Sequence, residues 1–412
     1  MLIAYRNAHI HVGDGTSLYG TLVTDGCRIV SVSEDPNSAE GAETVYDLHG
    51  KHIIPGLIDV HTHGRAGYDF NDATVEEMKT MAKSYVKSGV TTLMPTLASA
   101  PFAELTAAAD RILSLCGKTN ASPGMLPCFA GIHLEGRYLN LKKRGAHAPE
   151  YLAPLDPAEI ATLIPHLGKK FHVSAAYELD EDGAFLKTVL SAGGTAGLAH
   201  TEATYKEAMN AVRNGVVSFT HTFNAMPPLH HREGGAVTAA LTSDAYAELI
   251  ADGIHIAPEV IKLLYRTKGK NRLVLITDSM QATGMSDGVY TIAGLRCIVK
   301  DGKALTEDGH LAGSTLTLID GLRNLMHFCD LSLDEALPTA TRNPAAMVGI
   351  DGEVGTLESG KTADFLILRD GDLSSENPIE TVILGDRCSM NLYNNHGERS
   401  DSHADNSDLI QN

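Results

Sequence analysis

The sequence predicts an α/β fold in which a TIM-like (β/α)8 barrel carries a small discontinuous β-sandwich domain from both chain ends. The chain has 412 residues, of which 43% are hydrophobic and 20% charged, enough for a barrel and a companion domain. Beyond Pro55, short apolar runs alternate with segments of helical periodicity, as repeated βα units do. Both chain ends instead contain short strand-like runs broken by Gly and Asp.

Eight strands are predicted for the barrel. The apolar runs are IIPGLIDVHTHG, VTTLMPTL, PCFAGIHLEG, KFHVSAAYEL, GTAGLAHTEA, VSFTHTFNAM, AELIADGIHI and RLVLITDSM. Helix candidates between them include TVEEMKTMAKSYVKSG, DPAEIATLIPHLG, TYKEAMNAVRNG and APEVIKLLYRTKG, and several begin at Thr or Asp and end at Gly. Eight βα units favour a closed barrel over an open sheet.

The remaining segments define the expected domains. After the eighth strand, YTIAGLRCIVKDGKALT predicts a β excursion, and two helices are expected around TLIDGLRNLMHFC and LDEALPTATRNPAAMVG. We expect residues 1–54 and 348–390 to pair into the small β domain and residues 55–347 to form the barrel. The polar stretch 391–412 is expected to be disordered.

Composition and charge narrow the class of protein. The net charge of −18 disfavours nucleic acid or an anionic membrane as a partner, although one local arginine can still bind a small anion. No apolar run approaches the roughly 20 residues that span a bilayer, and the start does not resemble an export signal. The six cysteines are scattered without CxxC spacing. We therefore expect a cytoplasmic location and free thiols.

Metal-capable or acidic residues follow nearly every predicted barrel strand. They are His61 and His63, Glu135, Glu178, His200, His221, His255 and Asp278. In a parallel barrel all carboxyl ends of the strands share one face, so residues far apart in sequence converge there. A metal ion needs such convergence, because its ligands must lie within about 2–2.5 Å of one point.

Each of these residues also has an ordinary structural explanation. His61 and His63 alternate along a strand, and an isolated HxH is as often a packed or solvated pair as a metal site. Glu135 alone is equally compatible with an ion pair, and Asp278 with a helix cap. His200 and His221 taken singly fit satisfied core histidines. Their coincidence on one barrel face favours a shared site.

The residue types indicate a catalytic metal. Histidine and carboxylate ligands without cysteine are typical of a catalytic Zn²⁺ or Fe²⁺ site rather than a structural one. Such a metal supplies hydroxide near neutral pH, and a nearby carboxylate can take the proton and return it to a leaving amine. Asp278, at the last strand end, is the candidate for that acid and base. An adjacent imidazole can polarise the substrate carbonyl.

Several long motifs resemble a known family. PGLIDVHTHG is similar to the opening strand of the amidohydrolase superfamily. The more specific motifs are HLEG at 133–136, KKRGAH at 142–147, HTFNAMPPLHHREGG at 221–235, ELIADGIHI at 248–256, LITDSMQATGMSDGVY at 275–290 and LAGSTLTL at 311–318. Together they resemble the N-acetylglucosamine-6-phosphate deacetylases, across residues 1–385.

The resemblance implies a homodimer that hydrolyses an N-acetyl group from a sugar phosphate to give the free amine and acetate. Glu135, His200 and His221 match the principal metal ligands of the family, and Asp278 matches its catalytic acid and base. His147 matches a histidine that contacts the acetamide carbonyl. Four further residues match substrate-binding positions: Asn224, Ala225, Arg232 and His255. In the family the arginine reaches the phosphate across the dimer interface, as bidentate guanidinium binding favours.

Two features bear on the details of this resemblance. Members that keep both HxH histidines can hold two metals, and His61 and His63 are both present, so one or two ions are expected, Zn²⁺ first and Fe²⁺ as the alternative. Arg137 stands where the family usually has proline, and AAYELD replaces an APE-type run. Arg137 is interpreted as a solvated loop charge, with an altered sugar preference as the alternative.

Three other functions compete with this interpretation. The first is a deacetylase that prefers the galactosamine epimer, which differs at one hydroxyl. The second is another amidohydrolase, such as a dihydroorotase or dipeptidase-like enzyme, but strands three and four end in Glu135 and Glu178 without the bridging lysine common there. The third is a non-catalytic sugar-phosphate sensor, against which the intact ligand set and Asp278 argue.

Overall fold

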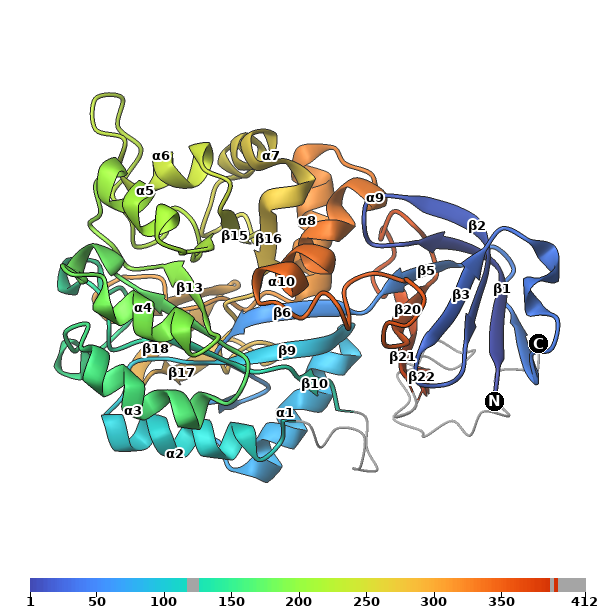
Figure 1. Cartoon of the computed structure of the whole chain (residues 1–412), viewed down its shortest axis with the longest axis horizontal. Coiled ribbons are helices and arrows are strands. Elements are labelled where there is room, and N and C mark those ends of the chain that lie inside the picture. Colours follow the sequence, from blue (N-terminus) through green and yellow to red (C-terminus); the bar gives the residue numbers. More distant parts are fainter. Residues whose placement is uncertain (117–125, 386–388, 392–412) are drawn as a thin grey trace.

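Parallel strands form a barrel in the larger part of the molecule (Figure 1). The computed structural model describes residues 1–116, 126–385 and 389–391. The barrel strands are β6 (Leu57–Thr62), β9 (Val90–Leu97), β10 (Cys128–Phe129), β11 (Ile132–Glu135), β12 (Phe171–Ala175), β13 (Thr195–Leu198), β14 (Ser218–Phe219), β15 (Tyr246–Ile250) and β16 (Leu273–Ile276). Because β10 and β11 both pair with β9, they form one interrupted strand. The ring therefore contains the eight strands that the sequence predicts, and that prediction is confirmed.

The last strand closes the ring against the first. The amide of Asp278, just beyond β16, donates to the carbonyl of His61 at 2.9 Å. One residue further on each side, Thr62 and Ser279 form a parallel bridge. This closure brings the first and eighth strand ends together, and with them two of the candidate site residues.

Helices follow most of the barrel strands and pack against their outer side. They are α1 (Val75–Lys87), α2 (Phe102–Leu113), α3 (Pro157–Leu167), α4 (Ala184–Ser191), α5 (Tyr205–Arg213), α6 (Gly235–Thr242), α7 (Pro258–Arg272), α8 (Leu318–Cys329), α9 (Leu333–Ala336) and α10 (Arg342–Met347). Short 3-10 turns are η1 (Pro36–Ala39), η2 (Leu141–Lys143), η3 (Pro149–Tyr151), η4 (Tyr177–Leu179) and η5 (Leu337–Ala340). The predicted Thr starts are capping boxes at Thr74 and Thr204.

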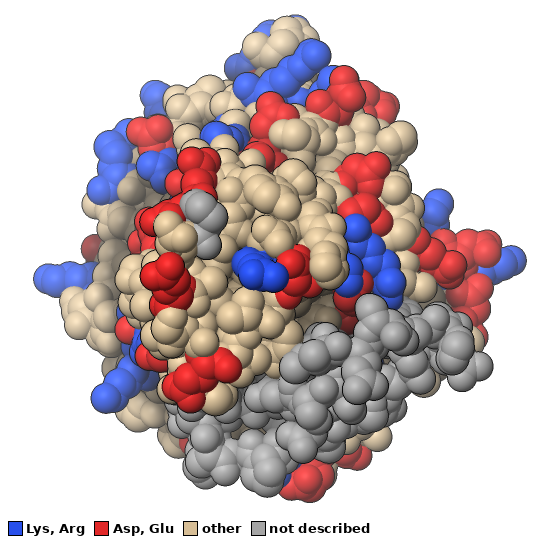
Figure 2. Space-filling model, turned by 90° about the vertical axis from the view of Figure 1, so that its right-hand side faces the viewer, with Lys and Arg blue, Asp and Glu red and all other residues tan. Residues whose placement is uncertain are grey.

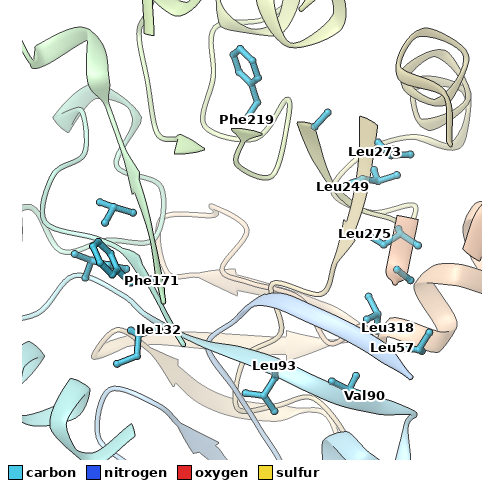
Figure 3. Close-up of a cluster of buried hydrophobic side chains, with 14 of the residues drawn as sticks. Leu57, Val90, Leu93, Ile132, Phe171, Phe219, Leu249, Leu273, Leu275 and Leu318 are labelled. Carbon is cyan, nitrogen blue, oxygen red and sulfur yellow. The ribbon is translucent and has the colours of Figure 1, made fainter. Parts of the chain in front are cut away.

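Residues of alternate parity point to opposite sides of each barrel strand. Leu249, Phe171 and Phe219 are among the fully or nearly fully buried side chains that Figure 3 shows on the outer side of the ring, toward the helices. Their neighbours in sequence, Glu248 and His172, therefore face the barrel interior. The interior thus combines an apolar part with a set of buried polar residues below the strand ends.

Strands from both ends of the chain share one further sheet. It contains β1 (Ile3–His11), β2 (Ser17–Thr24), β3 (Ile29–Ser33), β4 (Thr44–Asp47), β5 (His52–Pro55), β20 (Asp364–Leu368), β21 (Ile379–Leu384) and β22 (Ser389–Asn391). The two ends meet where β20 pairs antiparallel with β5. A separate cluster of buried hydrophobic residues packs together in this domain. Within it, the ring of Tyr5 packs edge-on against that of Phe365, with the ring centroids 5.0 Å apart. A sheet domain separate from the barrel is confirmed, while the exact boundaries stay a prediction.

The surface of this small sheet carries dispersed charge. On the face in Figure 2, acidic and basic side chains of the described residues surround a largely uncharged area. In the described part of the chain, no helix has the length and apolarity needed to cross a membrane. The predicted disorder of 391–412 falls, beyond Asn391, outside the described residues.

A three-stranded antiparallel sheet covers the carboxyl end of the barrel. It consists of β17 (Gly288–Ile292), β18 (Leu295–Lys300) and β19 (Lys303–Thr306), as the predicted β excursion requires. Its inner face buries Ile292, Cys297 and Val299 against Met280 and Ala312. A short hairpin of β7 (Gly64–Arg65) and β8 (Tyr68–Asp69) lies after the first barrel strand.

Candidate metal centre and active site

Four histidines from three strand ends surround the carboxylate of Glu135, which ends β11. Its Oε2 atom lies 3.0 Å from His63 Nε2 and 3.3 Å from His61 Nε2. Its Oε1 atom lies 2.8 Å from His221 Nε2 and 3.4 Å from His200 Nε2. Each oxygen of one carboxylate therefore faces a different pair of imidazoles.

These contacts define two donor groups that share Glu135. The His61 group consists of His61, His63, Glu135 and Asp278, and the His221 group of Glu135, His200 and His221. In each group one donor atom per residue lies within 4.8 Å of the others, as ligands of one ion would. Asp278 Oδ1 is 3.3 Å from His63 Nε2 and 3.5 Å from His61 Nε2. All five predicted ligands and Asp278 thus meet in one place.

The polar atoms of this centre fit a divalent cation. The buried His61 Nε2 has no hydrogen-bond partner among the described residues, although carboxylate oxygens of Glu135 and Asp278 surround it. A carboxylate oxygen cannot donate a hydrogen bond, so a lone pair on His61 Nε2 is satisfied there only by a proton or a metal cation between the three atoms. Imidazole and carboxylate donors without sulfur suit a catalytic metal position.

Three residues of the centre adopt left-handed backbone conformations. The φ angles are 45° at His200, 32° at His221 and 48° at Asp278. Such angles are unfavourable for residues with a Cβ and persist where surrounding contacts enforce them, often at functional sites. At Asp278 the carbonyl accepts from Ser314 N at 2.7 Å, besides the amide contact that closes the barrel. The sharp turns after the strands aim these side chains inward.

The centre is electrostatically coupled. Burial disfavours a charged imidazole at His63, but the carboxylates of Asp278 and Glu135 outweigh it and raise the pKa of His63 to about 9. The same opposition of burial and carboxylates raises the pKa of His61. Burial likewise opposes ionisation of Glu135, yet the nearby histidines, His61 foremost, hold its pKa well below the usual value. Glu135 is therefore an anion ready to bind positive charge.

His147 stands beside the centre as a neutral imidazole. Burial, reinforced by neighbouring His200, lowers the pKa of His147 to about 3. Its Nδ1 is hydrogen-bonded to Ser99 Oγ at 2.9 Å, and its Nε2 lies 4.0 Å from Glu135 Oε2. A neutral imidazole held in this way can donate to a substrate carbonyl without adding a second charge to the pocket.

The loop that carries His147 also orients a member of the His221 group. His200 Nδ1 donates to the carbonyl of Lys143 at 2.7 Å, and the amide of Asn140 donates to the carbonyl of His200 at 3.0 Å. The proton on Nδ1 leaves the lone pair on Nε2, which points at Glu135.

A pocket of about 380 Å³ opens onto the centre. Its walls contain predicted site residues (His63, Glu135, His147, His200, His221, Asn224, Ala225, His255 and Asp278) together with Lys142, Lys143, Ile292 and His310. His61 lies beneath it, fully buried. Arg232 does not line the pocket; it is exposed, with Nη1 2.7 Å from His231 Nε2.

The expectation that Glu178 lies in the pocket with the other residues at the strand ends is wrong. Glu178 lies in η4, and neither donor group includes it. Its carboxylate instead accepts from Asn140 Nδ2 at 3.0 Å, Thr201 Oγ1 at 2.6 Å and the amide of Glu202 at 2.8 Å. Because the chain turns after β12 instead of continuing inward, Glu178 ties together the loops that bear His147 and His200.

The interpretation of Arg137 as a solvated loop charge is wrong, and the alternative of an altered sugar preference stays a prediction. Its guanidinium is neither solvated nor in the pocket, since it pairs with Glu159 through two 3.1 Å contacts at 13% side-chain exposure. The φ angle of 64° at this position excludes proline, whose ring fixes φ near −65°. Arg137 thus anchors the loop after Glu135 to α3.

Several residues of the site have no sequence signal of their own. Ser99 follows β9 in an ordinary-looking turn, and only the fold brings it to His147. His310 also lines the pocket, but in the sequence it follows β19 and is far from the end of any barrel strand. Glu248 sits in the middle of an apolar run, 3.2 Å from His61 Nδ1. A charged residue inside a run predicted as a buried strand was the one available hint.

A model of the family described as "Amidohydrolase family" matches residues 52–388. The chain belongs to the amidohydrolase family. It is 34% identical to N-acetylglucosamine-6-phosphate deacetylase from Vibrio furnissii, over 76% of this chain and 78% of that protein. It is 36% identical to N-acetylgalactosamine-6-phosphate deacetylase from Escherichia coli O157:H7, over 77% of this chain and 84% of that protein. The resemblance drawn from the motifs is confirmed.

A solved structure of this kind superimposes over most of this amidohydrolase. A structure of N-acetyl-D-glucosamine-6-phosphate deacetylase from Mycobacterium smegmatis, a mutant in complex with N-acetyl-D-glucosamine-6-phosphate, has a TM-score of 0.83 and 31% identity. The match covers 94% of this chain and 98% of that chain. The two chains therefore share their overall architecture.

Proposed function

We propose that this amidohydrolase removes the acetyl group from an N-acetylhexosamine 6-phosphate, N-acetylglucosamine 6-phosphate first, as a step of amino-sugar breakdown. The observation that carries the proposal is the convergence of two donor groups on Glu135, next to a neutral His147, in one pocket. Relatives named as deacetylases of the glucosamine and galactosamine compounds support the substrate class. The galactosamine epimer is the second candidate, since the relative with that name is 36% identical.

Glu135, His200 and His221 would hold one divalent cation, and His61, His63 and Asp278 would complete a second position with Glu135. Zn²⁺ suits the donors, and Fe²⁺ is the alternative. When bound, such a cation acts as a Lewis acid and brings the pKa of water toward about 7, which supplies the nucleophile.

The chain's own residues would handle the protons and the developing charge. His147 donates to the acetamide carbonyl as negative charge grows on its oxygen. Asp278 takes a proton from the attacking water and gives it to the nitrogen as the C–N bond breaks. The acetyl carbon keeps the water oxygen and leaves as acetate, and the sugar leaves as the amine. Asn224, Ala225 and His255 would bind the sugar from the pocket wall.

The phosphate group requires cations at the pocket mouth. Lys142 and Lys143 line the pocket, but Lys143 Nζ is already 3.1 Å from a Glu202 carboxylate oxygen. We assign the main phosphate contact to Arg232 of a second subunit, because this exposed residue lies outside the pocket of its own chain. A homodimer follows from that assignment. Cys116, Cys297 and Cys329 are free thiols, which supports a cytoplasmic location.

The test is acetate release by the zinc-loaded, purified chain from both 6-phosphate epimers, with the unphosphorylated sugars as controls. We expect release from at least one 6-phosphate at a kcat/KM well above that for its unphosphorylated form. Release from neither epimer, in protein that retains zinc, would contradict the proposed function. A higher kcat/KM for the galactosamine compound would reassign the substrate to that epimer.

A further inference from the structure

The barrel interior beneath the pocket is unusually polar. Inner positions of such barrels are dominated by Val, Ile and Leu. Here Glu248 on β15, His172 and Ser174 on β12 and Ser218 on β14 occupy them, each at no more than 1% exposure. A buried carboxylate is costly unless its charge is compensated. Glu248 therefore calls for an explanation that packing alone does not supply.

The contacts of Glu248 lead directly to the metal centre. Its Oε2 atom accepts from His61 Nδ1 at 3.2 Å, and its Oε1 atom accepts from Ser218 Oγ at 3.1 Å. His172 Nε2 lies 3.9 Å from Oε1. Among the described residues no lysine or arginine forms an ion pair with Glu248. Its charge therefore has to be balanced through His61.

The hydrogen bond to Glu248 decides what the other nitrogen of His61 can do. A carboxylate only accepts, so the proton of a neutral His61 sits on Nδ1 and the lone pair sits on Nε2. That lone pair points at Glu135 Oε2 and Asp278 Oδ1, 3.3 and 3.5 Å away. A cation between these three atoms would coordinate all of them. Through the imidazole of His61, it would also compensate the negative charge of Glu248.

We propose that Glu248 is the positioning residue that fixes His61 as a ligand and thereby builds the cation position of the His61 group. The His221 group does not depend on it, because His200 is oriented instead by the Lys143 carbonyl. Binding of a second ion by this chain therefore depends on Glu248. The inference rests on the metal dependence proposed above.

The experiment counts Zn²⁺ ions on the full chain and measures both affinities by titrating metal-free protein against a chromophoric chelator. We expect two ions on the wild type. Glu248→Leu, which fits the apolar norm of barrel interiors, should weaken one ion by about 10–100-fold and leave the other unchanged. Glu248→Gln keeps an accepting oxygen and should weaken the same ion less. Two ions with wild-type affinities in Glu248→Leu, or equal weakening of both, would overturn the proposal.

Two comparisons separate positioning from a general structural effect. Ser174→Ala is the matched control, because Ser174 is equally buried and bonds His133 Nε2 at 2.8 Å, a residue outside both donor groups; it should keep both ions. His61→Asn should weaken the same ion that Glu248→Leu weakens, and the double variant should bind that ion no more weakly than His61→Asn alone. Additive losses would overturn the proposal, and this cycle can be run with Glu248→Gln if the leucine variant does not fold.

The outcome is distinguishable from failure of the proposed function. A wild type that binds two Zn²⁺ but releases no acetate would refute the deacetylase and leave the role of Glu248 intact. A wild type that binds one Zn²⁺ at saturation would refute the role of Glu248, whatever its activity.

Discussion

The division of labour between Glu135 and Asp278 follows from where their oxygens point. Glu135 presents one oxygen to each donor group, so removal of its carboxylate would take a ligand from both groups. Asp278 belongs to the His61 group alone and lines the pocket. Its position leaves it beside both the metal centre and the space for substrate. Glu135 is therefore a ligand common to both donor groups, whereas Asp278 is a donor of the His61 group that also serves as the proton carrier in the proposed reaction.

Asp278→Asn separates these roles. The amide keeps the shape of the side chain but cannot take a proton, so kcat should fall by at least about 10²–10⁴-fold. The ion of the His221 group should remain, because Asp278 does not contribute to it. Metal analysis of the purified variant checks this, with His221→Ala as the comparison that should lose that ion. An Asp278→Asn protein as metal-poor at the His221 group as His221→Ala would refute the assignment.

The raised pKa of His63 predicts how pH acts on the metal-free chain. Its imidazole has a pKa of about 9 when folded, against 6.5 as the ordinary value. The stabilisation from its protonated form is complete below pH 6.5 and is lost as pH rises to about 9. Over the same window Zn²⁺ affinity should rise, by up to about tenfold per pH unit for each proton released. Chelator titrations and thermal melts between pH 6 and 9 measure both, and a metal affinity independent of pH would contradict the expectation.

At the scale of elements, loops rather than strands determine the finer geometry. The strand ends deliver the ligands, but the segment from Arg137 to His147 sets how His147 and His200 are held. Its two anchors are the pair of Arg137 with Glu159 on α3 and the three hydrogen bonds accepted by Glu178. Both anchors hold the first residues of the loop, Arg137 and Asn140, and Glu178 also ties this part of the loop to the segment that follows His200.

Arg137→Ala tests the first anchor. Loss of a half-buried bidentate pair should lower the free energy of unfolding by about 1–3 kcal/mol. Because the residue is outside the pocket, the ratio of kcat/KM for the two epimers should stay unchanged. Denaturant unfolding and epimer kinetics provide the measurements. Glu159→Ala should cost more, because it also removes the acceptor of the buried Tyr138 hydroxyl, and the double variant should cost less than the sum. A changed epimer ratio would indicate a role in sugar preference.

The parts of the fold and of the site that can be predicted from the sequence are those that leave a periodic pattern of apolar residues. The eight barrel strands and the site residues at their ends follow from apolar runs and from the rule that parallel strand ends share one face. Glu178 shows where this rule fails. The rule predicts that Glu178 lies at the metal centre, but the turn after β12 directs its carboxylate elsewhere. Ser99 and the conformation of Arg137 were out of reach, since contacts between loops leave no periodic trace in a single sequence.

At the scale of the whole molecule, the exposed Arg232 predicts that a complete site needs two chains. Arg232→Ala should raise KM for the sugar phosphate by about 10–100-fold, as loss of a charged hydrogen bond implies, and affect the unphosphorylated sugar little. Arg213→Ala, at another exposed arginine, is the matched control and should behave as wild type. Equal effects on both sugars would exclude a phosphate role.

Mixing two defective proteins tests whether the arginine acts across subunits. In a heterodimer of Arg232→Ala and Asp278→Asn, one site combines an intact Asp278 with the intact Arg232 of the other chain. Activity at low sugar phosphate should therefore return after refolding a mixture of the two. No recovery in a mixture shown to contain heterodimers would place Arg232 in its own chain's site.

The pairing of β5 with β20 also has a consequence for synthesis on the ribosome. β5 is complete after residue 55, but its partner strand ends at residue 368. Throughout translation of the barrel, the nascent chain therefore carries a β edge with open hydrogen-bonding groups, which is the kind of edge that promotes aggregation. The barrel can begin to assemble during elongation, whereas the small sheet cannot pair β5 until β20 (Asp364–Leu368) has been made. Synthesis of β20, rather than of the first strands, is therefore the step that completes the pairing of this sheet.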